Sequence, residues 1–163
     1  MMSNLLSKAE VNEQSGFTFV GTSARTTNAA EMSGQGVIGA KWESFFRDQV
    51  LQQIEHRKDD TILALYTDYE SDESGAYTYA LGAKAEIEKQ AAAPWQTFVI
   101  PEQKYVVFTT RTGPIPEVVV EAWQAIWAWS KDNERAFTAD FEVYDHRAAD
   151  PKNSQVDIYI AVK

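Results

Sequence analysis

The residues of this chain that could do chemistry are a glutamate and several aromatic residues, on segments that alternate as strands do. In the segment 138–146, Glu142 and Tyr144 fall on one face, and Phe141 and Val143 fall on the other. We expect the apolar pair to pack beneath helices, because a helix-covered face favours apolar side chains. Glu142 and Tyr144 would then point into the opposite, concave face of a sheet.

The same alternation adds other residues to that concave face. In the segment 61–70, Leu63 and Leu65 are expected under the helix, while Tyr66 and Glu70 share the other face. Glu70 ends its strand, so it could lie at the mouth of a groove or in the following loop. The predicted groove is lined by Glu142, Tyr66, Tyr79, Tyr144 and Tyr159, with Trp127 at one wall.

A carboxylate ringed by aromatic side chains favours one class of ligand. Loss of hydration costs it several kcal/mol and raises its pKa when the groove is empty. A delocalised organic cation neutralises the charge and gains about 0.5–2 kcal/mol for each ring face that it contacts. A small inorganic cation prefers a full shell of oxygen ligands, and an anion would be repelled. The predicted ligand is therefore a lipophilic cation, with no metal and no cofactor.

Simpler interpretations of the same residues stay open. Glu142 could be a solvated carboxylate on a strand, and tyrosine is common on strands for reasons of packing alone. Trp42 and Trp123, on the two predicted helices, are interpreted as core residues. Trp127 could belong to the core, the surface or the pocket.

Signals for catalysis are weak, and no catalytic residue is predicted. The chain has no cysteine, its two histidines lie far apart, and no spacing suggests a metal site. There is no glycine-rich phosphate loop and no nucleophile elbow. Glu142 could act as a general acid or base if its pKa is raised, which leaves a small hydrolase as an alternative.

The chain carries an internal duplication with a period of about 80 residues. Residues 17–85 and 97–162 both read as strand, helix, strand, strand, which predicts repeats at 17–90 and 95–163. Trp42 corresponds to Trp123, Tyr66 to Tyr144, and Tyr79 to Tyr159. Two halves related in this way meet on a pseudo-twofold axis and leave a groove between them.

These elements predict an α+β domain with a mostly antiparallel sheet. Apolar residues at helical spacing predict helices at 37–53 and 112–134, and strands are expected over 17–27, 61–70, 76–85, 137–147 and 154–163. The segment 95–113 reads as extended with an interruption at Pro101. Each half has one helix and is marginal alone, so residues 17–163 are predicted to form one domain. Residues 1–16 are predicted to be a flexible arm.

Composition limits the class of partner. The net charge is −9 with no basic cluster, which disfavours direct binding to nucleic acid. No apolar run approaches the roughly 18 residues of a membrane span, and the absence of cysteine suits a reducing cytoplasm.

Nearly the whole chain, residues 17–163, resembles the GyrI-like or AraC-type effector-binding domains. The resemblance rests on the duplication, on the segment VVFTTRTGPIPEVVVEAWQAIWAW, on the E-x-Y group at Glu142, Val143 and Tyr144, and on the ending IYIAVK. Members of this family include ligand-sensing halves of transcription activators, a stand-alone gyrase inhibitor, and single-domain proteins on integron gene cassettes. The multidrug-sensing members bind lipophilic cations in an aromatic pocket with a buried glutamate.

The resemblance implies a stand-alone effector-binding protein for lipophilic cations that is linked to drug sensing or transcriptional regulation. Activators of the family carry a DNA-reading domain ahead of the ligand domain, and the sixteen residues before Phe17 are too few for one. We therefore expect the chain to act through a separate partner or to sequester its ligand. The alternatives are a protein-interaction module of the gyrase-inhibitor type and a small hydrolase.

Overall fold

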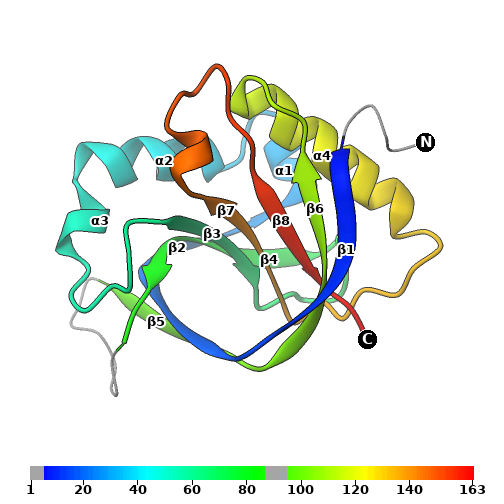
Figure 1. Ribbon diagram of the computed structural model, residues 1–163, viewed down its shortest axis with the longest axis horizontal. Helices are drawn as coiled ribbons and strands as arrows, with labels where there is room; N and C mark the ends of the chain where they lie inside the picture. Colours follow the sequence, from blue (N-terminus) through cyan, green and yellow to red (C-terminus); the bar gives the residue numbers. More distant parts are fainter. Residues whose placement is uncertain (1–5, 87–94) are drawn as a thin grey trace.

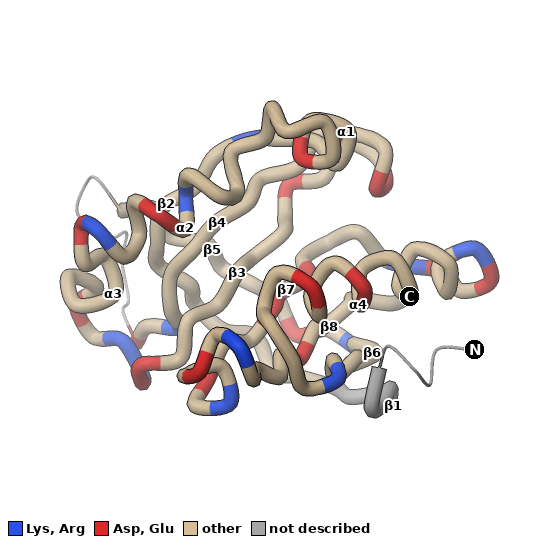
Figure 2. The backbone as a smooth tube through the Cα atoms, turned by 90° about the horizontal axis from the view of Figure 1, so that it is seen from above, with Lys and Arg blue, Asp and Glu red and all other residues tan. Residues whose placement is uncertain are grey.

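The computed structural model describes residues 6–86 and 95–163 (Figure 1). Helices gather on one side of a strongly curved sheet (Figure 2), and both repeats contribute to each layer. No helix in the described part of the chain is long and apolar enough to cross a membrane. In chain order the elements are β1 (Leu6–Gln14), β2 (Phe17–Thr27), α1 (Asn28–Met32), α2 (Ile38–Arg47), α3 (Val50–Gln53), β3 (Ile62–Thr67), β4 (Ala76–Lys84), β5 (Gln96–Ile100), β6 (Gln103–Thr110), α4 (Ile115–Trp129), β7 (Ala139–Tyr144), a short 3₁₀ turn (His146–Ala148) and β8 (Asp157–Ala161).

The eight strands form one antiparallel sheet in the order β1-β6-β8-β7-β3-β4-β2-β5. The two halves meet where β3 pairs with β7, and the order of strands outward from this seam is equivalent on the two sides. Ala64 lies opposite Glu142 at the middle of the seam. The predicted α+β class with a mostly antiparallel sheet is confirmed.

The start of the chain differs from the predicted flexible arm. Residues 6–14 form strand β1, which pairs with β6 of the second repeat. In the equivalent position, β5 of the second repeat pairs with β2 of the first. The halves therefore exchange their outermost strands, and each repeat has one more strand than predicted. Residues 1–5 and 87–94, which include the predicted end of the first repeat, lie outside the described residues.

The predicted helix over residues 37–53 is divided in two. Gln49 takes a left-handed conformation with φ of 51°, which ends α2 and begins α3 in a new direction. The connection between β2 and α2 contains a further short helix, α1, which was not among the predicted elements. It begins at Thr27, whose hydroxyl accepts a hydrogen bond from the Ala30 N–H, as an N-cap does. Helix α4 follows Pro114, where proline is tolerated.

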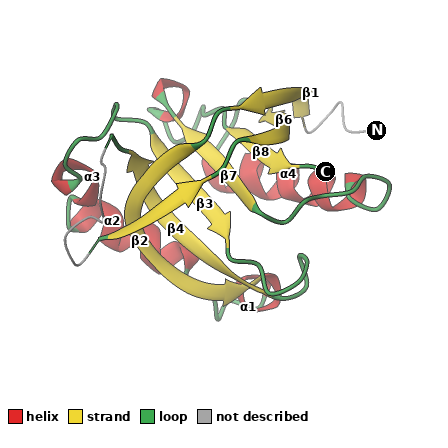
Figure 3. Ribbon diagram, turned by 90° about the horizontal axis from the view of Figure 1, so that it is seen from below, coloured by secondary structure: helices red, strands yellow, loops and turns green. Residues whose placement is uncertain are grey.

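The predicted assignment of the two sheet faces is wrong. Tyr66 and Tyr144 pack in the core beneath the helices, whereas Leu63, Leu65 and Phe141 pack on the other face. That second face is covered by the curl of the sheet itself (Figure 3). The Phe17 and Phe141 rings lie 5.4 Å apart, although β4 and β3 separate their strands in the sheet. Both faces are thus buried, and alternation alone could not tell which one the helices cover.

Candidate functional site

The centre of the candidate site is the Glu142 carboxylate, at the seam of the two repeats and 2% exposed. One of its oxygens, Oε2, accepts hydrogen bonds from the Tyr66 hydroxyl at 2.7 Å and the Trp123 indole N–H at 2.6 Å. The other, Oε1, accepts one from the Tyr144 hydroxyl at 2.6 Å. Tyr66 and Tyr144 occupy equivalent positions of the two repeats, so both halves of the chain hold the carboxylate.

The charge of Glu142 has no counter-charge among the side chains that the structure describes. Within residues 6–86 and 95–163, no lysine, arginine or histidine forms an ion pair with this carboxylate. Burial raises its pKa above the usual value, while the bonds from Tyr144, Trp123 and Tyr66 act in the opposite direction. Burial and the nearby carboxylate raise the pKa values of Tyr66 and Tyr144 well above the usual value, so both hydroxyls stay protonated as donors.

Glu142 borders a cavity of 1080 Å³ that is lined by residues of α2, α4, β3 and β7. Aromatic rings form much of its wall. The Trp42 and Tyr144 rings lie 4.8 Å apart, and the Tyr66 and Tyr79 rings 5.0 Å apart. Other acidic residues at its edge already have partners, since Asp145 pairs with Arg147 and Asp60 with Arg57. Glu142 is therefore the carboxylate of this cavity that lacks a cation.

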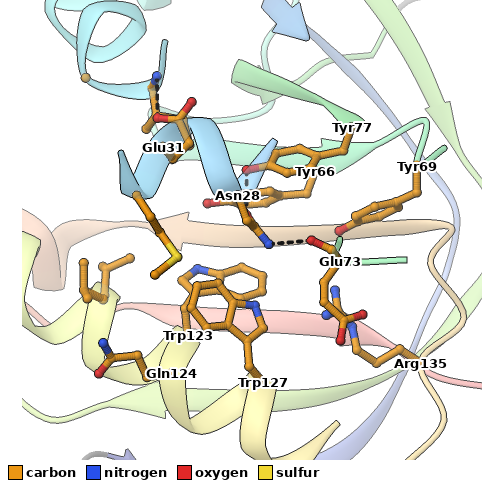
Figure 4. Close-up of a pocket in the computed structure, with 15 residues that line it drawn as sticks. Asn28, Glu31, Tyr66, Tyr69, Glu73, Tyr77, Trp123, Gln124, Trp127 and Arg135 are labelled. Carbon is orange, nitrogen blue, oxygen red and sulfur yellow. Dashed lines mark hydrogen bonds between the residues drawn. The ribbon is translucent and has the colours of Figure 1, made fainter. Parts of the chain in front are cut away.

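A second cavity of 460 Å³ adjoins the first and shares Ile38, Gly39, Tyr66, Val119 and Val120 with it. Figure 4 shows its aromatic lining, in which Trp123 and Trp127 of α4 face tyrosines of the sheet and of the loop after β3. Exposed apolar side chains also border the two cavities: Met32, Phe46 and Val120 are each more than half exposed. The two cavities together form one groove with an apolar rim.

The structure brings most of the predicted site residues together. Glu142, Tyr66, Tyr79 and Tyr144 line the larger cavity, and Trp127 lines the smaller one. They face the helices and not, as predicted, the side of the sheet away from them. Their role in binding a ligand stays a prediction.

Tyr159 and Glu70 do not join this group. Tyr159 lies on the opposite face of the sheet, where its ring stacks on Phe141 at 4.6 Å. Glu70 is exposed in the connection between β3 and β4, and it lines neither cavity. Of the two places predicted for Glu70, the loop is the one that the structure shows.

The misplacement of Tyr159 comes from the spacing of the repeats. Leu63 pairs with Gly82, and its equivalent Phe141 pairs with Tyr159. The counterpart of Tyr159 is therefore Gly82 and not Tyr79. The match of Tyr79 with Tyr159 is therefore in error by an odd number of positions. Because side chains alternate along a strand, such an error places the residue on the other face of the sheet.

Trp123 and Trp42 were interpreted as core residues, and both belong to the site. Trp123 donates to Glu142, and Trp42 donates through its indole N–H to the Tyr79 hydroxyl at 2.7 Å. A buried indole N–H needs an acceptor. That requirement, applied to two tryptophans at equivalent helix positions, is the signal that could have placed them near polar side chains of the sheet.

Replacing Trp42 by phenylalanine is expected to lower the free energy of unfolding by about 1 kcal/mol, because the variant loses the hydrogen bond to the buried Tyr79 hydroxyl. Chemical denaturation of the two proteins measures the difference. Glu43→Gln is a suitable control, since Glu43 is exposed on the same helix. Equal stability of Trp42→Phe and the wild type would contradict a structural role for this bond.

The described residues offer no group of three or more His, Asp or Glu side chains that could hold a metal ion. What the site does offer is a buried carboxylate held by neutral donors, beside an apolar and aromatic groove. This combination is suited to binding an organic molecule. The fold and the site together are of the kind expected in an effector-binding domain.

Comparison with known proteins places the chain in a family. Residues 10–162 match the family of integron-associated effector-binding proteins, Cass2, and the chain belongs to it. It is 43% identical to the Bacillus subtilis (strain 168) protein YobU over 148 residues, which cover 89% of this chain and 91% of that protein. YobU carries the name of a transcriptional regulator protein. The regulator BrlR of Pseudomonas aeruginosa is 31% identical over 130 residues, 77% of this chain and 46% of BrlR.

Solved structures agree with this assignment. The integron cassette protein VCH_CASS2 of Vibrio cholerae superposes with a TM-score of 0.76 at 31% identity, covering 97% of each chain. The protein SAV2435, solved with bound tetraphenylphosphonium, has the same TM-score at 18% identity and covers 96% of this chain and 94% of that one. The chain is thus an effector-binding domain related to transcription regulators, and its family is not defined by an enzymatic activity.

Proposed function

We propose that this protein binds lipophilic organic cations in the groove between α2 and α4, with Glu142 as the partner of the positive charge. The observation that carries the proposal is a carboxylate, 2% exposed, that has three neutral donors and no cation among the described residues. A permanent cation would supply the missing charge. The faces of the surrounding aromatic rings would contact the cation in place of its weakly bound hydration water.

The shape of the groove supports a bulky ligand. Its larger cavity of 1080 Å³ exceeds what small polar metabolites need and lies at the upper end of sites for drug-sized molecules. The lining residues include Trp42, Ile38 and Val119, which favour an apolar body. That SAV2435 has been solved with tetraphenylphosphonium supports the same ligand class.

A pair of ions with opposite charge tests the proposal. Tetraphenylphosphonium and tetraphenylborate are similar in size and shape, so they separate charge recognition from apolar contact. Phosphonium at 100 times its Kd is expected to stabilise the fold by about 2.7 kcal/mol and to quench the fluorescence of the tryptophans that line the groove. Borate at the same concentration should do neither.

Thermal unfolding and a fluorescence titration, both at constant ionic strength, measure these effects. Equal binding of the two ions would mean that the site selects apolar bulk and not charge. Absence of binding by phosphonium at millimolar concentration would remove the proposal altogether.

A further inference from the structure

Arg135 is a buried cation at the end of the smaller cavity, just before β7. Its side chain is 2% exposed, and its Nη2 donates to Asp140 Oδ2 at 2.8 Å. The guanidinium carbon lies 4.4 Å from the centre of the Phe137 ring and 5.9 Å from that of the Trp123 ring. Figure 4 shows Arg135 beside the aromatic lining of the cavity. A charged group is thus held firmly beside the aromatic wall of the smaller cavity.

Two nitrogen atoms of this guanidinium have no hydrogen-bond partner. Nε and Nη1 are buried, and among the described residues neither finds an acceptor. Buried donors without partners are rare in folded proteins, and each costs about 1–3 kcal/mol. The fold accepts this cost beside a cavity that Arg135 itself lines.

The tyrosine hydroxyls of this cavity are already engaged. Tyr77 donates to Asn28 Oδ1 at 2.9 Å, and Tyr69 donates to Asp140. Tyr66 donates to Glu142. Among the described buried side chains that line this cavity, Arg135 therefore carries the N–H groups left for a ligand oxygen. Both nitrogen atoms are closed to a water-sized molecule in the empty cavity, so a ligand oxygen would reach them by a small rotation of the guanidinium.

We propose that Arg135 forms a second subsite, which binds a neutral hydrogen-bond acceptor of the ligand, such as a carbonyl oxygen. The inference rests on the proposed function, because it places the cationic part of the same ligand at Glu142. Trp123 connects the two subsites: its N–H donates to Glu142, and its ring lies next to Arg135. The ligand class is then a lipophilic cation that carries a carbonyl group on an aromatic or apolar arm.

The charges near Arg135 select a neutral acceptor over an anion. Asp140 already pairs with the guanidinium, and Glu73 lines the same cavity. The cavity end thus holds two acidic groups for one arginine, and a carboxylate on the ligand would add a third. A carbonyl oxygen accepts the same hydrogen bonds without that repulsion.

Three phosphonium ions test the subsite. (4-Acetylphenyl)triphenylphosphonium carries a carbonyl, (4-ethylphenyl)triphenylphosphonium is its near-isostere without one, and (4-carboxyphenyl)triphenylphosphonium carries an anion. In the wild type the acetyl compound should bind about tenfold more tightly than the ethyl compound, because a hydrogen bond to a charged donor is gained. The carboxyphenyl compound should bind no better than the ethyl compound. Fluorescence titration gives the three dissociation constants.

Arg135→Lys is the matched variant, since lysine can keep the charge pair with Asp140 but lacks Nε and Nη1. The ratio between the acetyl and ethyl compounds should fall from about ten to about one. Arg111→Lys, at a half-exposed arginine paired with Glu121, should leave the ratio unchanged. A ratio that persists in Arg135→Lys would show that another group binds the carbonyl, and would overturn the proposal.

A measurement on the wild type keeps the test independent of how the variant folds. With ¹⁵N-labelled arginine, the Nε–H signal of buried Arg135 should move on adding the acetyl compound and stay in place with the ethyl compound. Equal affinity of these two compounds, with both bound, overturns the Arg135 subsite and leaves the cation site at Glu142 standing. Failure of both to bind removes the two proposals together.

Discussion

Replacing Glu142 by glutamine is expected to weaken the binding of tetraphenylphosphonium by about 10- to 100-fold. The reason is the loss of a buried charge that faces the cation, an interaction worth about 1–3 kcal/mol. Glutamine keeps nearly the same size. Its carbonyl oxygen can take the place of Oε2 and accept from Trp123 and Tyr66, and its NH2 group can donate to the Tyr144 hydroxyl oxygen, so the wall of the cavity should be preserved. A neutral ligand of similar shape, triphenylphosphine oxide, should lose much less affinity.

Glu117→Gln is the matched control for this variant. Glu117 is exposed in the first turn of α4, and it lines neither cavity. The variant Glu117→Gln removes the same single charge from the protein, so it reports any effect of net charge on ligand binding. Salt screens such long-range effects. Isothermal titration of the two variants with both ligands gives the comparison. Equal losses for the phosphonium and the phosphine oxide in Glu142→Gln would show that shape and not charge determines affinity.

The local parts of the fold could be predicted from the sequence. Residues that favour strands, beginning directly after Gly16, predict a strand at residues 17–27, and β2 has these bounds. The alternation in 138–146 also placed Glu142 and Tyr144 on one face, and the duplication matched Tyr144 with Tyr66. Each of these inferences depends on neighbours within one strand, or on an offset between repeats that the strands themselves preserve.

The parts that could not be predicted depend on contacts between distant segments. Strand β1 forms by pairing with the edge of β6, about a hundred positions later in the chain. The sequence of residues 6–14 alone does not indicate this pairing. The curl of the sheet that brings Phe17 over Phe141 buries its second face. Apolar side chains therefore lie on both faces, and they do not indicate which face the helices cover. The placement of Tyr159 in the groove was wrong for another reason: the offset between equivalent residues of the two repeats changes within the second half.

Arg135 shows the same limit at the site. In the sequence it lies in a charged turn after α4, where a solvated side chain is the ordinary expectation. Its burial arises from Asp140, five residues later, and from the rings of Phe137 and Trp123. A residue whose role depends on three partners from different elements carries no periodic signal of its own.

The affinity for a permanent cation is expected to rise with pH by up to tenfold per unit and then to level off. Burial raises the pKa of Glu142 in the empty protein, whereas the bound cation favours the ionised form. Below that raised pKa, binding must release a proton, and this cost disappears once the carboxylate is ionised. Titration with tetraphenylphosphonium between about pH 5 and 8 measures the slope, because this ligand does not titrate.

The stability of the empty protein should change in the opposite direction. A carboxyl group whose pKa is higher in the folded state than in the unfolded state binds more protons when folded. Its contribution to the free energy of unfolding is therefore fully present below its ordinary pKa of 4.5 and falls as pH rises through the raised value. Glu142→Gln should lack both dependences, and because His146 at the cavity edge is present in both proteins, their difference isolates Glu142. A phosphonium affinity independent of pH, with identical stability profiles for the two proteins, would mean that this carboxylate is already ionised throughout the range.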